Sequence, residues 1–434
     1  MSTVGSDLME NAVSSQPAAV PAARSLAYLM SQYPMLSMIF VLREVLQLRE
    51  MGFHIDVASI NNPDRPPEQM TAEERTEASK AYHLRSHAAA DGVAGHIRTL
   101  ITRPRGYFRG IRLLVRLGGT DLRKLILHFM YFSEALMVGV WMRRLGHRHL
   151  HVHLASQAAT VGMYVRHIFD VGYSLTVHGP DEFYDAYGQH LEEKIKAADF
   201  ICCISHFARS QMMKFSERSQ WSKFVVSRLG VDPSIFSPRP MRVSPDVFEL
   251  LCVGRLTSAK GQHLLIEAVG RLARQGRRLR LRLVGSGPDD ASLRAQAEEL
   301  DSPDLVVFEG AVNQDHIRKL YGAADIFCIA SVAEGIPVVL MEAMAMQIAC
   351  VTTHITGIPE LIRNGCDGLL VAPSDVDGMV KALAQLMDDP ELRDRLGRSA
   401  RARVLQHYDL RRSVEKLGAI FAERVVTDRH GSAV

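Results

Sequence analysis

Strand-like and helix-like segments alternate along the chain, and this order constrains the fold more than any other feature. SLAYLMS at residues 25–31 is an apolar strand-like run, and IFVLREVLQLREMG at 39–52 has apolar residues at helical spacing and a final glycine. FHIDVASI at 53–60 then returns to a strand pattern. The order strand, helix, strand predicts a parallel sheet whose strands are joined by helical crossovers.

The same alternation resumes after a proline-rich linker, DPSIFSPRPMRVSPD at 232–246, which suits a domain boundary. The sequence therefore predicts an α/β protein with two Rossmann-like, doubly wound domains that face a cleft. We expect a disordered tail at 1–24, an N-terminal domain at 25–235, a linker at 236–247, a C-terminal domain at 248–405, and a closing helix and tail at 406–434. That closing helix is expected to pack back on the N-terminal domain.

Composition narrows the class of protein. The chain has 434 residues, 47% of them hydrophobic, and a formal net charge of only +3, which does not favour a nucleic-acid partner. Its six cysteines lack paired spacing and mostly lie in apolar stretches, which indicates a reducing compartment and hence the cytoplasm. We expect no signal peptide in the tail and no segment apolar enough to span a bilayer.

The stretch EGIPVVLME at 334–342 places two glutamates around an apolar run. Pro337 suits the first turn of a helix, whose free N–H groups can hold a phosphate. Glu342 follows about 7.5 Å further along the helix axis. Glu334 and Glu342 can then hold hydroxyl groups on either side of a diphosphate. The equally weighted alternative is that Glu334 caps the helix and that Glu342 is a solvated helix residue.

A second motif, VGRLTSAKG, is basic. It places Arg255 just after an apolar strand and Lys260 five residues later. Arginine supplies a bidentate fork and lysine a point charge, so the pair suits a diphosphate. Taken alone, an ordinary surface loop with basic residues is the favoured explanation.

Together with LVGSGPDDASLR, VFEGAV and SRLGVDPSIFSP, these motifs resemble the retaining, nucleotide-sugar-dependent glycosyltransferases of the GT-B fold that carry an E-x7-E motif. The resemblance covers nearly the whole chain after the tail. It implies a metal-independent hexosyltransferase with no cofactor and a UDP- or GDP-linked donor. It also implies that Glu334 contacts the donor sugar, Glu342 the ribose, Arg255 and Lys260 the diphosphate, and the backbone around Val312 the nucleobase. The implied donor-binding set is Gly254, Arg255, Lys260, Val312, Glu334, Gly335, Ile336, Pro337, Val338 and Glu342.

The N-terminal half carries the acceptor side of this resemblance. His178, in YSLTVHGPDEF, resembles the family's histidine near the reacting sugar, and it completes a catalytic set with Glu334, Arg255 and Lys260. YPMLSMIFVLRE and HLHVHLASQAATVG resemble a subgroup that assembles bacterial exopolysaccharides such as colanic acid, although Met38 departs from that subgroup's loop. The acceptor-side candidates are Ser37, His153 and Asp181.

Four alternating histidines at 147, 149, 151 and 153 would share one face of a strand. A zinc site there needs further ligands, and no cysteine or carboxylate has matching spacing, so we expect no metal. The H-x-H pair at His151 and His153 is expected to line the cleft.

Residues 98–124 carry eight Arg or Lys and one acid, interleaved with aliphatic and aromatic residues. A basic amphipathic helix of this kind suits an anionic membrane surface, and a solvated helix face is the alternative.

The expected function is transfer of a sugar to a saccharide or polyprenyl-linked oligosaccharide in envelope or exopolysaccharide synthesis, in the cytoplasm at the inner face of the cell membrane. Two alternatives stay open. One is a GT-B nucleotide-sugar epimerase, and the other is a catalytically silent assembly protein that binds sugar nucleotides.

Overall fold

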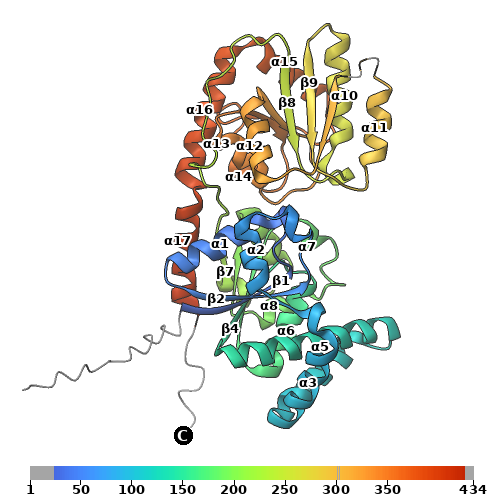
Figure 1. Ribbon diagram of the computed structural model, residues 1–434, viewed down its shortest axis with the longest axis vertical. Helices are drawn as coiled ribbons and strands as arrows, with labels where there is room; N and C mark the ends of the chain where they lie inside the picture. Colours follow the sequence, from blue (N-terminus) through green and yellow to red (C-terminus); the bar gives the residue numbers. More distant parts are fainter. Residues whose placement is uncertain (1–23, 301, 303, 426–434) are drawn as a thin grey trace, which may run out of the picture.

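The computed structural model describes residues 24–300, 302 and 304–425, and it shows two α/β domains stacked along the long axis of the molecule (Figure 1). The N-terminal sheet has seven parallel strands in the order β3-β2-β1-β4-β5-β6-β7. Its strands are β1 (Ser25–Gln32), β2 (His54–Asn61), β3 (Tyr82–His83), β4 (His149–His153), β5 (Gly172–Val177), β6 (Phe200–Cys203) and β7 (Phe224–Val226). The predicted doubly wound parallel sheet is confirmed.

Helices cover both faces of this sheet because its strands alternate their side chains between two cores. In β1, Leu26 and Tyr28 enter one apolar cluster, while Ala27 and Leu29 enter another on the opposite face. The helices of this half are α1 (Ile39–Glu50), α2 (Ala72–Lys80), α3 (Leu84–Thr102), α4 (Pro104–Gly118), α5 (Leu122–Leu145), α6 (Gln157–Phe169), α7 (Asp181–Tyr184), α8 (Leu191–Ala197) and α9 (His206–Lys214).

The C-terminal domain repeats the design with six parallel strands in the order β10-β9-β8-β11-β12-β13. The strands are β8 (Phe248–Val253), β9 (Leu279–Val284), β10 (Val306–Gly310), β11 (Ile326–Ile329), β12 (Ala349–Thr353) and β13 (Leu369–Val371). The helices are α10 (Gln262–Arg274), α11 (Asp290–Glu298), α12 (Gln314–Ala323), α13 (Val338–Ala345), α14 (Ile358–Leu361), α15 (Val376–Asp388) and α16 (Pro390–His407). In each sheet the first strand, β1 or β8, has the next strand of the chain on one side and a later strand, β4 or β11, on the other. Folds of this kind bind ligands at this reversal of the strand order.

The last helix, α17 (Leu410–Arg424), leaves the C-terminal domain and packs on the N-terminal one, as the red ribbon at the left of Figure 1 shows. Its Phe421 is fully buried, with ring centroids 4.9 Å from His151 and 6.3 Å from Tyr28. The expected cleft position of His151 is therefore wrong, because this histidine lies beneath the closing helix.

The basic segment 98–124 does not form one helix. It spans the end of α3, all of α4 and the start of α5, with breaks at Arg103–Pro104 and at Gly119, which has a φ of +59°. The expectation that no segment could span a bilayer also needs correction. Among the described residues, α5 is long and apolar enough to do so by length and composition, and half of its apolar window is buried inside the protein.

Candidate functional site

Glu334 and Lys260 meet at the carboxyl ends of two neighbouring strands. Lys260 ends a short 3-10 turn after β8, and Glu334 lies in the loop between β11 and α13. Lys260 Nζ lies 2.6 Å from Glu334 Oε1, which also accepts a hydrogen bond of 2.8 Å from Ser331 Oγ. The Glu334 side chain is only 11% exposed. The structure thus joins a cation and a carboxylate that stand 74 residues apart in the chain.

The turn before Lys260 is set by the glycine that follows it. Gly261 has a φ of +65°, and a Cβ there would lie 2.1 Å from the Ala330 carbonyl oxygen. Only glycine fits this close, left-handed position, so it fixes the loop after β8 against the loop after β11.

The two domains touch at the same place. A Cβ on Gly335 would lie 1.9 Å from the carbonyl oxygen of His178, so the backbone after β5 lies directly against the backbone after Glu334. A second contact joins α1 to α12, where Arg43 donates a 2.8 Å hydrogen bond to Gln314. His178 and Glu334 are therefore neighbours across the domain boundary, as their expected shared site requires.

Glu342 lies inside the C-terminal domain. Pro337 is the N-cap of α13, and the helix begins at Val338. Glu342 is buried, and its Oε2 accepts a hydrogen bond of 2.9 Å from the Tyr321 hydroxyl. Burial raises the pKa of this carboxyl to about 7, against the opposing influence of Arg43 and Tyr321. The alternative of a solvated helix residue is wrong, and Glu334 does not cap α13 either, since Pro337 holds that position.

The other expected donor-binding residues surround this corner. Gly254 and the exposed Arg255 follow β8, and Val312 follows β10 and packs on the edge of the domain core. Ile336 and Pro337 are buried, and Val338 is half-buried at the helix start. These loops all start from the same edge of the C-terminal sheet. Arg255, Lys260 and the N-terminus of α13 therefore place positive charge at that edge.

A chain of buried side chains stands behind His178. Its Nε2 lies 3.0 Å from His153 Nδ1, and His153 Nε2 lies 3.2 Å from Glu44 Oε1, which also accepts a 2.9 Å bond from the Tyr28 hydroxyl. Burial lowers the pKa of His178 well below its usual range, so the imidazole is neutral at physiological pH. Its Nδ1 is buried and has no hydrogen-bond partner within the described part of the chain.

This arrangement corrects the expected role of His153. The side chain is buried, and its two nitrogens face His178 and Glu44, so it is not free to contact an acceptor. No sequence motif points to Glu44, because it lies on α1 at a spacing that indicates only a helix position. Ser37 and Asp181 are exposed in the segments that follow β1 and β5, where an acceptor can reach them.

A buried carboxylate holds the loop that carries His178. Glu182 accepts backbone hydrogen bonds from the N–H groups of Ala155, His178 and Gly179. Lys194 is fully buried beside it and donates 2.8 Å and 2.9 Å bonds to the carbonyls of Ala155 and Ser156. Burial raises the pKa of Glu182 to about 7 and lowers that of Lys194 to about 7. These groups hold the backbone of the loops that follow β4 and β5.

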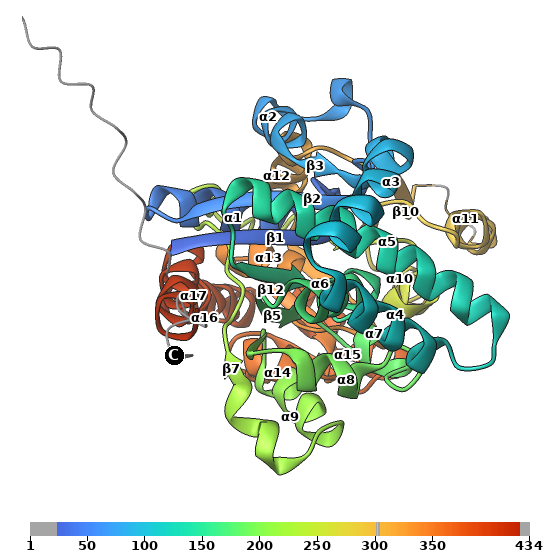
Figure 2. The same cartoon turned by 90° about the horizontal axis from the view of Figure 1, so that it is seen from below.

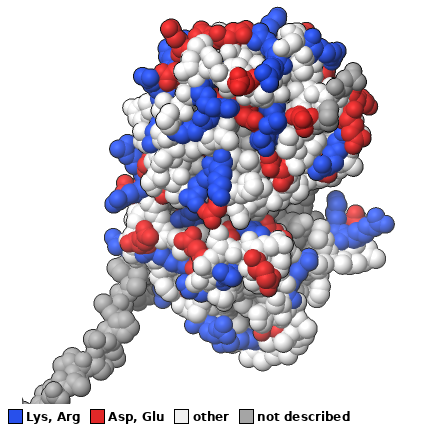
Figure 3. Space-filling view, turned by 45° about the horizontal axis from the view of Figure 1, so that its top comes forward, with Lys and Arg blue, Asp and Glu red and all other residues white. Residues whose placement is uncertain are grey.

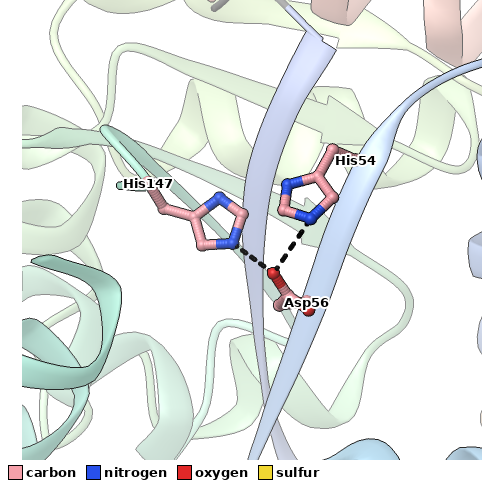
Figure 4. Close-up of side chains that lie close together, drawn as sticks. All are labelled: His54, Asp56 and His147. Atoms are coloured by element: carbon pink, nitrogen blue, oxygen red, sulfur yellow. Dashed lines mark hydrogen bonds and ion pairs between the residues drawn. The ribbon is translucent and has the colours of Figure 1, made fainter. Parts of the chain in front are cut away.

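The first of the four alternating histidines, unlike the other three, lies outside the strand β4. His147 precedes β4, and its Nε2 lies 2.7 Å from Asp56 Oδ2, which also lies 3.6 Å from His54 Nε2 (Figure 4). Ligand atoms of these three side chains lie within 4.8 Å of one another. The cluster sits at the amino ends of β2 and β4, the opposite edge of the sheet from His178. The hydrogen bond from His147 lowers the pKa of Asp56 and accounts for the pairing.

Known glycosyltransferases are similar to this chain in sequence. Residues 238–403 match the family described as "Glycosyl transferases group 1". The chain is 28% identical, over 385 residues, to the putative colanic acid biosynthesis glycosyltransferase WcaL of Escherichia coli (strain K12), covering 84% of this chain and 91% of that protein. It is 34% identical over 170 residues to the amylovoran biosynthesis glycosyltransferase AmsK of Erwinia amylovora, covering 38% and 42% of the two chains.

Solved structures share the architecture. Sucrose-phosphate synthase from Thermosynechococcus elongatus superposes with a TM-score of 0.71 at 18% identity, over 92% of this chain and 99% of that one. Anabaena Alr3699/HepE in complex with UDP-glucose gives a TM-score of 0.69 at 16% identity, with the same coverage. The chain therefore has the GT-B fold, and its residues 238–403 form a group 1 glycosyltransferase domain.

Proposed function

We propose that this enzyme is a retaining hexosyltransferase that moves a sugar from a nucleotide-diphosphate sugar to a saccharide or polyprenyl-linked oligosaccharide during exopolysaccharide synthesis. The observation that carries the proposal is the Lys260–Glu334 pair at the start of α13, with His178 directly across the domain boundary. The names of the colanic acid and amylovoran relatives support the pathway. The UDP-glucose complex of the HepE structure supports a UDP-linked donor, with GDP as the other candidate.

Charge on the leaving diphosphate sets the main electrostatic task, because the glycosidic bond breaks toward a nucleoside diphosphate. We assign this task to Arg255, Lys260 and the N-terminal N–H groups of α13. In the free protein Glu334 already holds Lys260 at 2.6 Å. An arriving diphosphate competes for that ammonium group and leaves Glu334 free to accept hydroxyl hydrogen bonds from the donor sugar. These groups supply positive charge at the diphosphate, so we propose that transfer needs no metal.

Glu342 is assigned to the ribose, and the backbone at Val312 to the nucleobase. The backbone of Gly254 and of Gly335 through Val338 completes the donor site. His178, held neutral by burial, offers the unpartnered Nδ1 as a hydrogen-bond acceptor for a hydroxyl of the donor sugar. Ser37 and Asp181, which are exposed after β1 and β5, are assigned to the acceptor side.

The test is a donor screen followed by a transfer assay. A specific nucleotide sugar raises the melting temperature because it binds only the native state. The donor so found is then incubated with and without membrane extract as the acceptor source. Nucleoside diphosphate release that depends on the extract supports transfer, whereas an isomerised free donor supports an epimerase. Binding without either product supports a silent assembly protein.

The enzyme is proposed to work in the cytoplasm at the inner face of the cell membrane, which it contacts through the basic residues of 98–124. All six cysteines are free and five of them are buried, which is consistent with a reducing compartment.

A further inference from the structure

Helices α3, α4 and α5 pack together into a bundle that projects beyond the N-terminal sheet, away from the C-terminal domain (Figures 1 and 2). This bundle gathers the exposed apolar surface of the molecule. Of the nineteen large hydrophobic side chains that are exposed in the described chain, eleven lie between Val93 and Met130. Contiguous exposed apolar surface with a polar rim marks a membrane or protein contact.

Helix α3 exposes large apolar side chains and buries small residues. A surface helix of a soluble protein buries its large apolar side chains and exposes polar ones. In α3 the positions i, i+4, i+7 and i+8 are apolar and between 43% and 74% exposed, and they are Val93, Ile97, Leu100 and Ile101. The buried positions in its middle are small, namely Gly92, Gly95 and Thr99. A Cβ on Gly95 would be in ordinary contact with the Leu136 side chain on α5, at 3.4 Å, so the face of α3 that carries this small residue is the one that packs against α5.

The first half of α5 repeats this pattern. Leu122, Ile126, Phe129 and Met130 stand at the same i, i+4, i+7 and i+8 spacing and are between 51% and 70% exposed. From Phe132 onward the apolar side chains of this helix are mostly buried in the core of the N-terminal domain. The helix is therefore apolar along its length, but these four side chains of its first half stay more than half exposed. The unburied half of its apolar window is this exposed face.

Basic side chains share the exposed surface of these three helices. Exposed cations stand on all three helices at Arg98, Arg105, Arg112, Arg116, Arg123 and Lys124. Asp121, the one acid between residues 98 and 124, accepts hydrogen bonds from the backbone N–H groups that begin α5. Figure 3 shows basic side chains with little acidic surface on the projection at its right. An apolar centre with a basic rim complements the acyl boundary and the negative headgroups of an anionic bilayer.

We propose that α3 and the first half of α5 insert their apolar faces shallowly into an anionic lipid bilayer, while the arginines of α4 bind its headgroups. This goes beyond charge attraction by residues 98–124, because the apolar contacts persist when salt screens the charges. The inference rests on the proposed function only in that a polyprenyl-linked acceptor lies in the same bilayer. The proposed partner of the two apolar faces is the lipid surface. The competing partner is a second copy of the chain.

The test is flotation of the full chain with phosphatidylcholine vesicles, with and without phosphatidylglycerol, in the absence of any donor. Binding is measured at low salt and at about 1 M salt, where the Debye length falls to about 3 Å. The wild type is expected to float with the phosphatidylglycerol vesicles and to keep a measurable fraction at high salt. Ile97→Glu combined with Ile126→Glu is expected to lower partitioning at least tenfold at both salt concentrations.

Two further variants separate charge from insertion. Combined Arg105→Gln, Arg112→Gln and Arg116→Gln is expected to lower partitioning at low salt and leave the high-salt fraction unchanged. Val243→Glu is the matched control, since Val243 is 59% exposed in the linker, and it is expected to float as the wild type does. Because all these positions are exposed, unchanged melting temperatures verify that the variants are folded.

Absence of flotation with every vesicle overturns the proposal, and so does wild-type flotation of the Ile97→Glu/Ile126→Glu protein. A wild-type dimer in light scattering that this variant splits, without vesicle binding, assigns the two faces to a second copy and equally overturns it. Donor-induced thermal shifts measured without lipid test the transferase assignment separately. Failure of one proposal therefore leaves the other measurable.

Discussion

Replacing Glu342 with glutamine should stabilise the free protein while weakening its nucleotide site. Burial raises the pKa of Glu342 to about 7 from the ordinary value of 4.5. One pKa unit corresponds to about 1.4 kcal/mol, so the ionised carboxylate costs the folded state about 3 kcal/mol above pH 7. Glutamine never ionises and still accepts the Tyr321 hydrogen bond through its carbonyl oxygen. The Glu342→Gln protein should therefore gain up to about 3 kcal/mol at pH 8.

The pH window of this gain follows from the two pKa values. Below pH 4.5 the carboxyl is protonated in both the folded and the unfolded chain, so the variant has no advantage. Between pH 4.5 and 7 the unfolded chain ionises first, and the advantage grows. Above pH 7 both states are ionised, and the full difference remains.

Thermal unfolding at pH 8 and at pH 5 measures the effect. A gain of this size corresponds to a melting-temperature rise of up to about 10 °C at pH 8 and a much smaller one at pH 5. Glu298→Gln, on the exposed face of α11, is the matched control and should change neither value. Equal melting temperatures of wild type and Glu342→Gln at pH 8 would refute the argument that burial makes this carboxylate costly.

Binding supplies the opposing half of this prediction. If the ribose hydroxyls donate to the Glu342 carboxylate, nucleoside diphosphate binding near pH 6 should release a proton, because the ligand favours the ionised form. Calorimetry in two buffers with different ionisation enthalpies detects that proton. The Glu342→Gln protein should bind the nucleoside diphosphate more weakly and release up to one proton fewer than the wild type does, since the phosphate of the ligand also loses protons at a cationic site.

Other predictions concern the same corner of the molecule. Lys260→Ala and Arg255→Ala should each weaken nucleoside diphosphate binding about tenfold or more with the fold intact, because each removes a charge-assisted contact; unchanged affinity by calorimetry in both would sink the phosphate assignment. Glu334→Gln should lower turnover about a hundredfold while changing nucleotide affinity far less, and the reverse pattern would show that the two carboxylates are exchanged in role. Gly335→Ala should lower the free energy of unfolding by about 1–3 kcal/mol, since its Cβ would lie 1.9 Å from the His178 carbonyl oxygen, and an unchanged urea midpoint would count against that close contact.

Much of the fold follows from local pattern. The strands of both sheets appear in the sequence as short apolar runs between amphipathic helices, and the proline-rich linker separates the two series. The bundle of α3 to α5 did not follow, because the apolar faces of α3 and of the first half of α5 point outward. A periodicity argument assumes that apolar residues face a core, which fails at Ile97 and Ile126.

The site was predictable only where a motif carried it. Glu334 and Lys260 stood in recognisable motifs, and the structure brings them together. Glu44, Glu182 and Lys194 were not singled out as supports of His178, because their partners lie on other elements. Their burial and bonding depend on how the strands of the sheet are placed, which no local spacing reveals. His153 shows the same limit, since a strand pattern assigns a face but not what covers it.

The placement of α17 has a consequence for how the protein is made. Phe421 fills the core of the N-terminal domain against Tyr28, Phe53 and Phe200, yet it is synthesised only after the whole C-terminal domain. While the ribosome is still producing the C-terminal domain, the N-terminal domain lacks one side of its hydrophobic core. The N-terminal domain thus emerges before the C-terminal domain but is finished after it, and a stop codon just before α17 would damage the domain that lies further from it in sequence.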